Sequence, residues 1–180
     1  MTLRKQRGFK FEYHIVEMLR NRGFNAKKSG GNTVGFPDII ATRHYTLLGI
    51  EAKSVAGFHA YIPLDQIQRC FQLLEMFNLY QNRYAIAAFK FMSKVTGNDF
   101  RRPIKYYYFL MEERFFEHIE QFKYLRCVYN GELAFITELD ESLRKKRKNN
   151  VLPVKLPYVT FNNNDITFDT NWLVQKKLTV

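Results

Sequence analysis

The feature that most constrains the fold is an amphipathic helix between two apolar segments typical of strands. Apolar side chains recur at helical spacing after Pro63, a residue favoured at the start of a helix. The stripe consists of Ile67, Cys70, Phe71, Leu74 and Phe77. Residues 46–53 precede this helix and residues 84–91 follow it, and both segments are apolar enough for strands. This order predicts a strand–helix–strand unit of an α/β protein.

Segments on either side of this unit extend the predicted sheet and its helices. Residues 9–22 are expected to form a helix ended by Gly23, and residues 23–28 to lead into a flexible loop over residues 29–33. Residues 37–42 are expected to form a strand that turns back through residues 43–45. Further strands are expected at 105–110 and 124–129, a short helix at 112–122 and weak strands within 151–180. The expected fold class is α/β, with a central mixed β-sheet flanked by helices.

The charge of the chain favours a polyanionic partner. Lys and Arg number 28 against 17 acidic residues, which gives a formal net charge of +11 and a pI near 9.7. Such an excess favours nucleic acid first and an acidic membrane surface second, while a merely soluble basic protein stays open. No signal peptide or transmembrane segment is visible in the sequence. Cys70 and Cys127 lie in apolar surroundings, which suits buried thiols in a reducing cytoplasm.

Three acidic residues and one lysine in the first third of the chain could form a site. Glu12 falls within the apolar face of its helix, where a carboxylate needs a cation, a proton or another partner. Glu51 and Lys53 share one face of their strand, roughly 7 Å apart, and Asp38 opens the preceding strand. Carboxylates are the ligands that Mg²⁺ prefers, and the lysine can hold an attacking water beside a phosphodiester. The pattern predicts a metal-dependent nuclease.

Each part of this pattern also has an ordinary structural interpretation. An acidic residue two positions before a lysine on a strand is more often a solvated ion pair, and an Asp after a Pro commonly caps a turn. The order of the four residues, on a helix, a strand and the next strand, favours a shared site.

At the level of motifs, residues 7–54 resemble the archaeal Holliday junction resolvase branch of the PD-(D/E)XK nuclease superfamily. The similarity rests on Arg-Lys-Gln-Arg-Gly-Phe-Lys-Phe-Glu (4–12), Phe-Pro-Asp-Ile-Ile-Ala (36–41) and Ile-Glu-Ala-Lys-Ser (50–54). It continues more weakly to residues 85–90, which is roughly half of the chain. The resemblance implies a restriction-endonuclease-like fold and a homodimer. It also implies Mg²⁺-dependent cutting of two strands across a four-way DNA junction, with Mn²⁺ able to substitute.

The resemblance also implies roles for individual residues. Asp38, Glu51 and Glu12 match the acids that hold metal, and Lys53 matches the catalytic lysine. Members use a loop serine before the aspartate. In this chain, an alignment of the loop without gaps places Asn32 at the position of that serine. The hydroxyl group of Ser29 or Thr33 can substitute for the serine hydroxyl. The residues expected to contact DNA are Arg4, Lys5, Arg7, Lys10, Lys28, Asn32 and Gln66. For the basic residues near the N-terminus, a charged frayed terminus is an equal alternative.

The sequence also predicts how the chain is divided. We expect a nuclease domain over residues 1–139, and a basic linker and C-terminal extension over 140–180, packed on the same domain. Residues 144–148 could form a DNA-contacting arm or a solvated linker, and the aromatic run 106–110 could offer stacking surfaces or pack in the core.

Two other functions stay open beside the resolvase. One is a PD-(D/E)XK nuclease of repair or of a mobile element, and the other is a non-catalytic DNA-binding protein. The loop after residue 28 lacks the Gly-Lys-Ser/Thr of a phosphate-binding loop, so no nucleotide cofactor is expected. The expected location is the cytoplasm, at the nucleoid of an archaeon or in cells infected by an archaeal virus.

Overall fold

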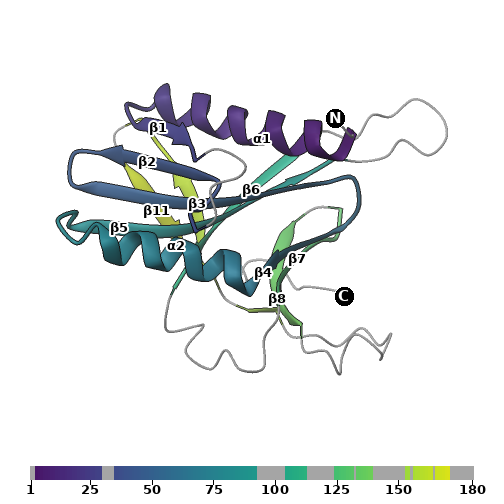
Figure 1. Ribbon diagram of the computed structural model, residues 1–180. Helices are drawn as coiled ribbons and strands as arrows, with labels where there is room; N and C mark the ends of the chain where they lie inside the picture. Colours follow the sequence, from purple (N-terminus) through teal and green to yellow (C-terminus); the bar gives the residue numbers. More distant parts are fainter. Residues whose placement is uncertain are drawn as a thin grey trace.

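Two helices and two β-sheets make up the part of the chain that the computed structural model describes (Figure 1). The described residues are 3–29, 35–92, 104–112, 124–131, 133–139, 153–154, 156–163 and 165–170. The helices are α1 (Leu3–Arg20) and α2 (Leu64–Met76). Within these described residues, no helix is long and apolar enough to cross a bilayer.

A seven-stranded sheet forms the centre of the molecule. Its order is β1-β2-β3-β5-β6-β10-β11. The strands are β1 (Asn25–Lys28), β2 (Ile39–Arg43), β3 (Thr46–Val55), β5 (Asn82–Phe91), β6 (Lys105–Met111), β10 (Tyr158–Phe161) and β11 (Ile166–Asp169). Strands β3 and β5 are parallel and are joined through α2, whereas the other recorded pairs in this sheet are antiparallel. The expected α/β class with a central mixed sheet flanked by helices is confirmed, and so is the strand–helix–strand unit.

A four-stranded antiparallel sheet lies beside the end of β3 (Figure 1). Its order is β4-β7-β8-β9, formed by β4 (His59–Pro63), β7 (Tyr124–Tyr129), β8 (Ala134–Leu139) and β9 (Pro153–Val154). Strand β4 follows β3 directly along the chain, but its partner β7 lies far downstream. The C-terminal strands therefore enter both sheets: β9 joins this one, and β10 and β11 join the central one.

Apolar side chains fill the space on both faces of the central sheet. On one face α1 packs Phe11, Ile15 and Leu19 against Ile50 and Ile86. On the other face α2 and the four-stranded sheet enclose a second cluster. That cluster includes Ile67, Cys70, Phe89, Phe109, Leu125 and Cys127. Both cysteines are buried and outside any disulfide, as the sequence predicts. Tyr106, Tyr108 and Phe109 pack against these two clusters, which matches the core alternative for the aromatic run.

Several boundaries differ from the sequence expectations. Helix α1 begins at Leu3, six residues before the expected start, and residues 25–28 form strand β1, where the sequence predicts no strand. The error at β1 arises because Ala26 is its one buried side chain, so the strand is fixed by backbone pairing with β2. Strands β4 and β8 were not expected. The helix expected at 112–122 falls outside the described residues, apart from Glu112.

Candidate active site

Asp38, Glu51 and Lys53 come together at the hairpin of β2 and β3. Ile39 pairs with Ile50 in this hairpin, so Asp38, one residue earlier, lies beside Glu51. Lys53 Nζ lies 2.5 Å from Glu51 Oε1 and 4.0 Å from Asp38 Oδ2. The backbone N–H of Ala52 donates to Asp38 Oδ2 at 2.9 Å, which fixes the orientation of that carboxylate. The prediction that Glu51 and Lys53 share one strand face is confirmed by their contact.

Burial gives Glu51 an unusual electrostatic state. Its side chain is the one charged group among the described residues that is buried, with 1% of its surface exposed. Burial raises the pKa of Glu51 to about 7 from its ordinary value of 4.5. The positive charge of Lys53 opposes this shift, and the negative charge of Asp38 adds to it. Without a cation at the site, the Glu51 carboxyl group therefore holds a proton near neutral pH for part of the time.

Helix α2 seals the inner side of this cluster because Gly49 lets it approach. A Cβ atom at Gly49 would lie 3.2 Å from Leu73 Cδ2 and 3.6 Å from Pro37 Cγ. The Cys70 thiol is fully buried in the same layer. Burial raises its pKa, and the negative charges of Glu51 and Asp38 raise it further. Cys70 is therefore a neutral thiol that packs behind the carboxylates, and it is not an activated nucleophile.

The donor set at this hairpin fits a divalent cation such as Mg²⁺. The Glu51 carboxyl group on β3 lies beside that of Asp38, just before β2, and the charge of Asp38 disfavours ionisation of Glu51. A hard cation between them would offset both the mutual repulsion and the desolvation of Glu51. Two carboxylates with water and phosphate oxygens are a common ligand set for Mg²⁺.

Glu12 lies on the opposite face of the sheet, in an ion pair with Lys28. Lys28 Nζ lies 2.5 Å from Glu12 Oε2, and both side chains are mostly buried. The same ammonium lies 3.8 Å from the ring centroid of Phe9 and 5.0 Å from that of Tyr13. The expected need of Glu12 for a partner is thus met by a cation. Among the described residues, no three His, Cys, Asp or Glu side chains lie close enough together to hold a metal ion.

Ser29 and Gln66 flank the hairpin cluster in different ways. The Ser29 hydroxyl donates to the Pro37 carbonyl, and its N–H donates to the Asp38 carbonyl at 3.1 Å. Ser29 therefore braces the backbone that carries Asp38. The Oε1 atom of Gln66, on the first turn of α2, is buried without a hydrogen-bond partner among the described residues.

Four of the remaining predicted DNA contacts, Arg4, Lys5, Arg7 and Lys10, lie on α1. Arg7 and Lys10 are exposed on this helix. The side chains of Arg4 and Lys5 lie outside the described residues, as do Asn32 and Thr33.

Lys90 is a further basic residue near α1, at a position where the sequence predicts no DNA contact. It stands in register with Ser54 of β3 and Tyr106 of β6, near the rings of Phe11 and Tyr106. Burial lowers the pKa of Lys90, and the nearby charge of Lys10 lowers it further. The signal in the sequence is a lysine near the end of an otherwise apolar strand.

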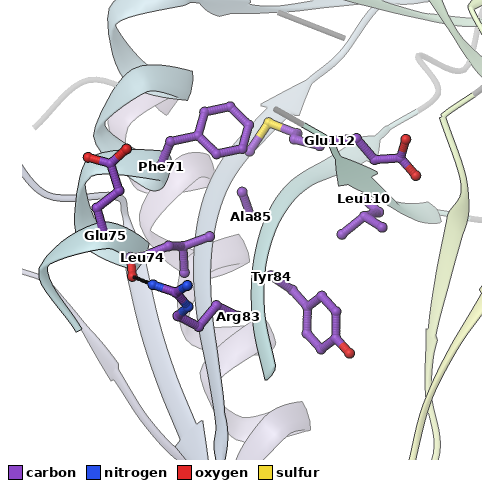
Figure 2. A pocket seen from close by; sticks show the side chains of 9 residues that line it. Phe71, Leu74, Glu75, Arg83, Tyr84, Ala85, Leu110 and Glu112 are labelled. Carbon is purple, nitrogen blue, oxygen red and sulfur yellow. Dashed lines mark hydrogen bonds between the residues drawn. The ribbon is translucent and has the colours of Figure 1, made fainter. Parts of the chain in front are cut away.

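The pocket in Figure 2 lies away from these residues. It has a volume of about 270 Å³, between α2, β5 and β6. The lining residues are Phe71, Leu74, Glu75, Arg83, Tyr84, Ala85, Leu110, Met111 and Glu112. Arg83 Nη1 donates to the Leu74 carbonyl at 2.7 Å and ties the strand to the helix. None of the candidate catalytic residues lines this pocket.

Comparisons with known proteins point to one family. The model of the archaeal Holliday junction resolvase (Hjc) family matches residues 3–105. A crossover junction endodeoxyribonuclease of Sulfolobus islandicus rod-shaped virus 1 is 35% identical over 77 residues, 41% of this chain and 64% of that protein. The crossover junction endodeoxyribonuclease Hje of Saccharolobus islandicus strain REY15A is 37% identical over 71 residues, 38% of this chain and 53% of that protein. The chain thus spans less than two thirds of these curated relatives.

A solved structure is also similar. It is that of Hjc from Archaeoglobus fulgidus, a Holliday junction resolvase, with 24% identity and a TM-score of 0.44 over 74% of this chain and 86% of that chain. The family match alone spans α1 to the start of β6 and contains Glu12, Asp38, Glu51 and Lys53. It covers more than half of the 180 residues, and the chain therefore belongs to the archaeal Holliday junction resolvase family.

Proposed function

We propose that this protein is a structure-selective endonuclease that resolves four-way DNA junctions as a Mg²⁺-dependent homodimer. The observation that carries the proposal is the cluster of Asp38, Glu51 and Lys53 in a member of the resolvase family. A buried carboxylate beside a second carboxylate and an ammonium is costly unless it serves a charged ligand. A cation and a phosphodiester together provide such a ligand.

Each residue of the cluster has a role that its geometry supports. Asp38, oriented by the Ala52 N–H, and Glu51 are proposed to hold Mg²⁺. When bound, Mg²⁺ neutralises charge on the scissile phosphate and lowers the pKa of water. Lys53 is placed to donate a hydrogen bond to the attacking water and to offset negative charge that develops on the phosphate. Ser29 keeps the Asp38 backbone in place through its contacts with residues 37 and 38.

Other basic and polar residues are proposed to bind the DNA backbone. The charge of Lys10 lowers the pKa of Lys90, and an anion bound near both ammonium groups would relieve this repulsion. Arg7 lies one helical turn before Lys10 and extends the same surface. We include Arg4, Lys5, Lys28, Asn32 and Gln66 among the proposed DNA contacts. Phosphate contacts of this kind recognise the shape of the branched DNA rather than its sequence.

Glu12 is proposed to act from the other side of the sheet. Its carboxylate is held by Lys28, which matches a position where an arginine is common in the family. A DNA phosphate that binds Lys28 would compete with Glu12 for the ammonium. We include Glu12 among the proposed metal-holding acids because the resemblance implies it, although Lys28 holds its carboxylate on the α1 face of the sheet.

The first prediction concerns the substrate. The purified protein is expected to cut a synthetic four-way junction at symmetric positions in two opposed strands when Mg²⁺ is present, and to leave it intact in EDTA. Flap and linear duplex DNA at equal concentration are expected to be cut far more slowly. Denaturing gels with each strand labelled in turn measure this. Equal cutting of duplex and junction would instead favour a nuclease of another kind.

The second prediction concerns the dimer. Met76, Phe77 and Leu79 at the end of α2 are exposed, with Leu79 at 91%, and such an apolar patch marks an interaction surface. A two-fold dimer presents two sites to two opposed strands. The double variant Met76→Lys, Leu79→Lys is expected to elute as a monomer in size-exclusion chromatography with light scattering. The matched control is Gln72→Lys, Gln81→Lys, which adds the same charge at neighbouring exposed positions and is expected to stay dimeric.

A PD-(D/E)XK nuclease of repair or of a mobile element is the second candidate function. It is favoured by the segment after residue 105, which lies outside the family match and contributes most of β6 and the strands β7 to β11 to the two sheets. A non-catalytic DNA-binding role is disfavoured because the three acidic residues and the lysine that the resemblance implies for catalysis are all present in this chain. In either nuclease, the proposed place of action is the nucleoid in the cytoplasm.

A further inference from the structure

The outward face of the four-stranded sheet carries aromatic and basic side chains. On β4, Ala60 and Ile62 point into the core, and on β7 the same is true of Leu125 and Cys127. Because side chains alternate along a strand, their neighbours point outward. We call the outward set His59, Tyr61, Tyr124 and Arg126 the tyrosine face.

The two rings of the tyrosine face form one exposed aromatic surface. Tyr61 pairs directly with Arg126 across the strands, and Tyr124 pairs with Pro63, so Tyr124 is the diagonal neighbour of Tyr61. The ring centroids of Tyr61 and Tyr124 lie 6.4 Å apart in an edge-to-face arrangement. Tyr61 is 42% exposed and Tyr124 is 36% exposed. These rings do not complete a core, and both are accessible to a ligand.

The charge of the tyrosine face is complementary to DNA. Burial lowers the pKa of His59, and the positive charge of Arg126 lowers it further, so the imidazole is neutral at pH 7 and Arg126 carries the charge. Among the described outward-facing residues of β4 and β7, none is an Asp or a Glu. The chain as a whole has a net charge of +11.

The tyrosine face is close in the chain to the candidate active site. Only residues 56–58 separate β3, which carries Glu51 and Lys53, from β4. Strand β4 then leads directly into α2, whose first turn carries Gln66. Figure 1 shows the four-stranded sheet beside the end of β3. Strand β7 lies beyond residue 105, so half of this face comes from outside the family match.

We propose that the tyrosine face is a second DNA contact, where Tyr61 and Tyr124 stack on bases exposed at a branch point and Arg126 binds an adjacent phosphate. Aromatic rings stack on any base, because every base has a π-face, and this suits an enzyme that recognises shape. A guanidinium beside the rings adds a bidentate phosphate contact. The inference rests on the proposed function, because that function identifies the ligand as DNA.

The test compares leucine with phenylalanine at both tyrosines. Fluorescence anisotropy in EDTA measures the affinity for a four-way junction, a single strand and a linear duplex. The Tyr61→Leu, Tyr124→Leu variant is expected to bind junction and single strand about 10-fold more weakly or worse, with a smaller loss on duplex. The Tyr61→Phe, Tyr124→Phe control keeps both rings and is expected to stay within about twofold of wild type.

A second variant tests the face without changing an aromatic ring. Arg126→Gln is expected to weaken binding to all three DNAs and to lower the slope of log affinity against log salt by about one. Circular dichroism confirms the fold of each variant. If the leucine variant does not fold, the Arg126→Gln variant alone tests the inference. An Arg126→Gln protein with the DNA affinity and salt slope of wild type would overturn the inference.

The remaining outcomes separate this inference from the proposed function. Wild-type affinity of the leucine variant for all three DNAs would overturn the inference while junction cutting stands. A changed oligomeric state at unchanged DNA affinity would make the face a protein interface and also overturn it. If wild type binds single strand and duplex but does not cut the junction, the proposed function fails and the variants still decide the face. A wild type that binds none of the DNAs overturns both.

Discussion

Asp38→Asn and Glu51→Gln are each expected to lower the rate of junction cleavage by about a thousand-fold or more. Each change replaces a charged oxygen ligand with a neutral amide of the same size, so the attraction for a divalent cation falls. The amide introduced by Asp38→Asn keeps an oxygen that can accept the Ala52 N–H, which preserves the local backbone. Single-turnover cleavage with excess enzyme measures the chemical step directly.

Exposed carboxylates provide the matched control for this loss. Asp65→Asn and Glu75→Gln make the same chemical changes on α2, at exposed positions outside the hairpin cluster. Both controls are expected to cut at close to the wild-type rate. The two active-site variants are expected to keep their affinity for the junction in EDTA, which distinguishes lost chemistry from lost binding. Cleavage at the wild-type rate by either Asp38→Asn or Glu51→Gln would remove these carboxylates from the mechanism.

The hairpin cluster could be predicted because its geometry is local. Asp38 directly precedes β2, Glu51 lies on β3, and a tight turn joins the two strands, so the alternation of side chains and the β2–β3 pairing determine which groups face each other. The same alternation places Lys53 on the strand face that carries Glu51. The raised pKa of Glu51 could not be predicted, since it depends on how closely α2 packs at Gly49.

The surroundings of Glu12 and the second sheet were harder to predict for a physical reason. The helical periodicity places Glu12 in an apolar face, but its partner Lys28 is fixed by the pairing of β1 with β2. Strand β4 alternates in burial, yet its partner β7 is separated from it by α2, β5 and β6. Such pairings depend on the closure of long loops, which a local sequence pattern does not specify.

The stability of the metal-free protein is expected to fall as pH rises from about 4.5 to about 7 because of Glu51. Its pKa is about 7 in the folded chain and 4.5 as its ordinary value, so the folded state binds more protons in this window. Stability decreases with pH wherever the folded state holds the extra proton. The contribution is fully present below pH 4.5, is lost above pH 7, and amounts to about 3 kcal/mol at most.

Glu51→Gln isolates this effect from the other titrating groups. Burial lowers the pKa of His14 and His59, so their contributions to stability rise with pH and oppose that of Glu51. Urea unfolding of wild type and Glu51→Gln at several pH values in EDTA gives the two free energies of unfolding. Their difference is expected to follow the Glu51 titration, since the histidines are common to both proteins.

Added Mg²⁺ is expected to reverse this pH dependence in wild type but not in Glu51→Gln. A cation and a proton compete for the same carboxylate, so Mg²⁺ stabilises the folded chain most above pH 7, where the proton has left. Each tenfold excess of Mg²⁺ over its Kd adds about 1.4 kcal/mol to the free energy of unfolding. If wild type and Glu51→Gln instead show parallel pH curves with and without Mg²⁺, then Glu51 titrates as an ordinary carboxylate and binds no cation. That result would contradict both the burial argument and the proposed role of Glu51 in holding the metal.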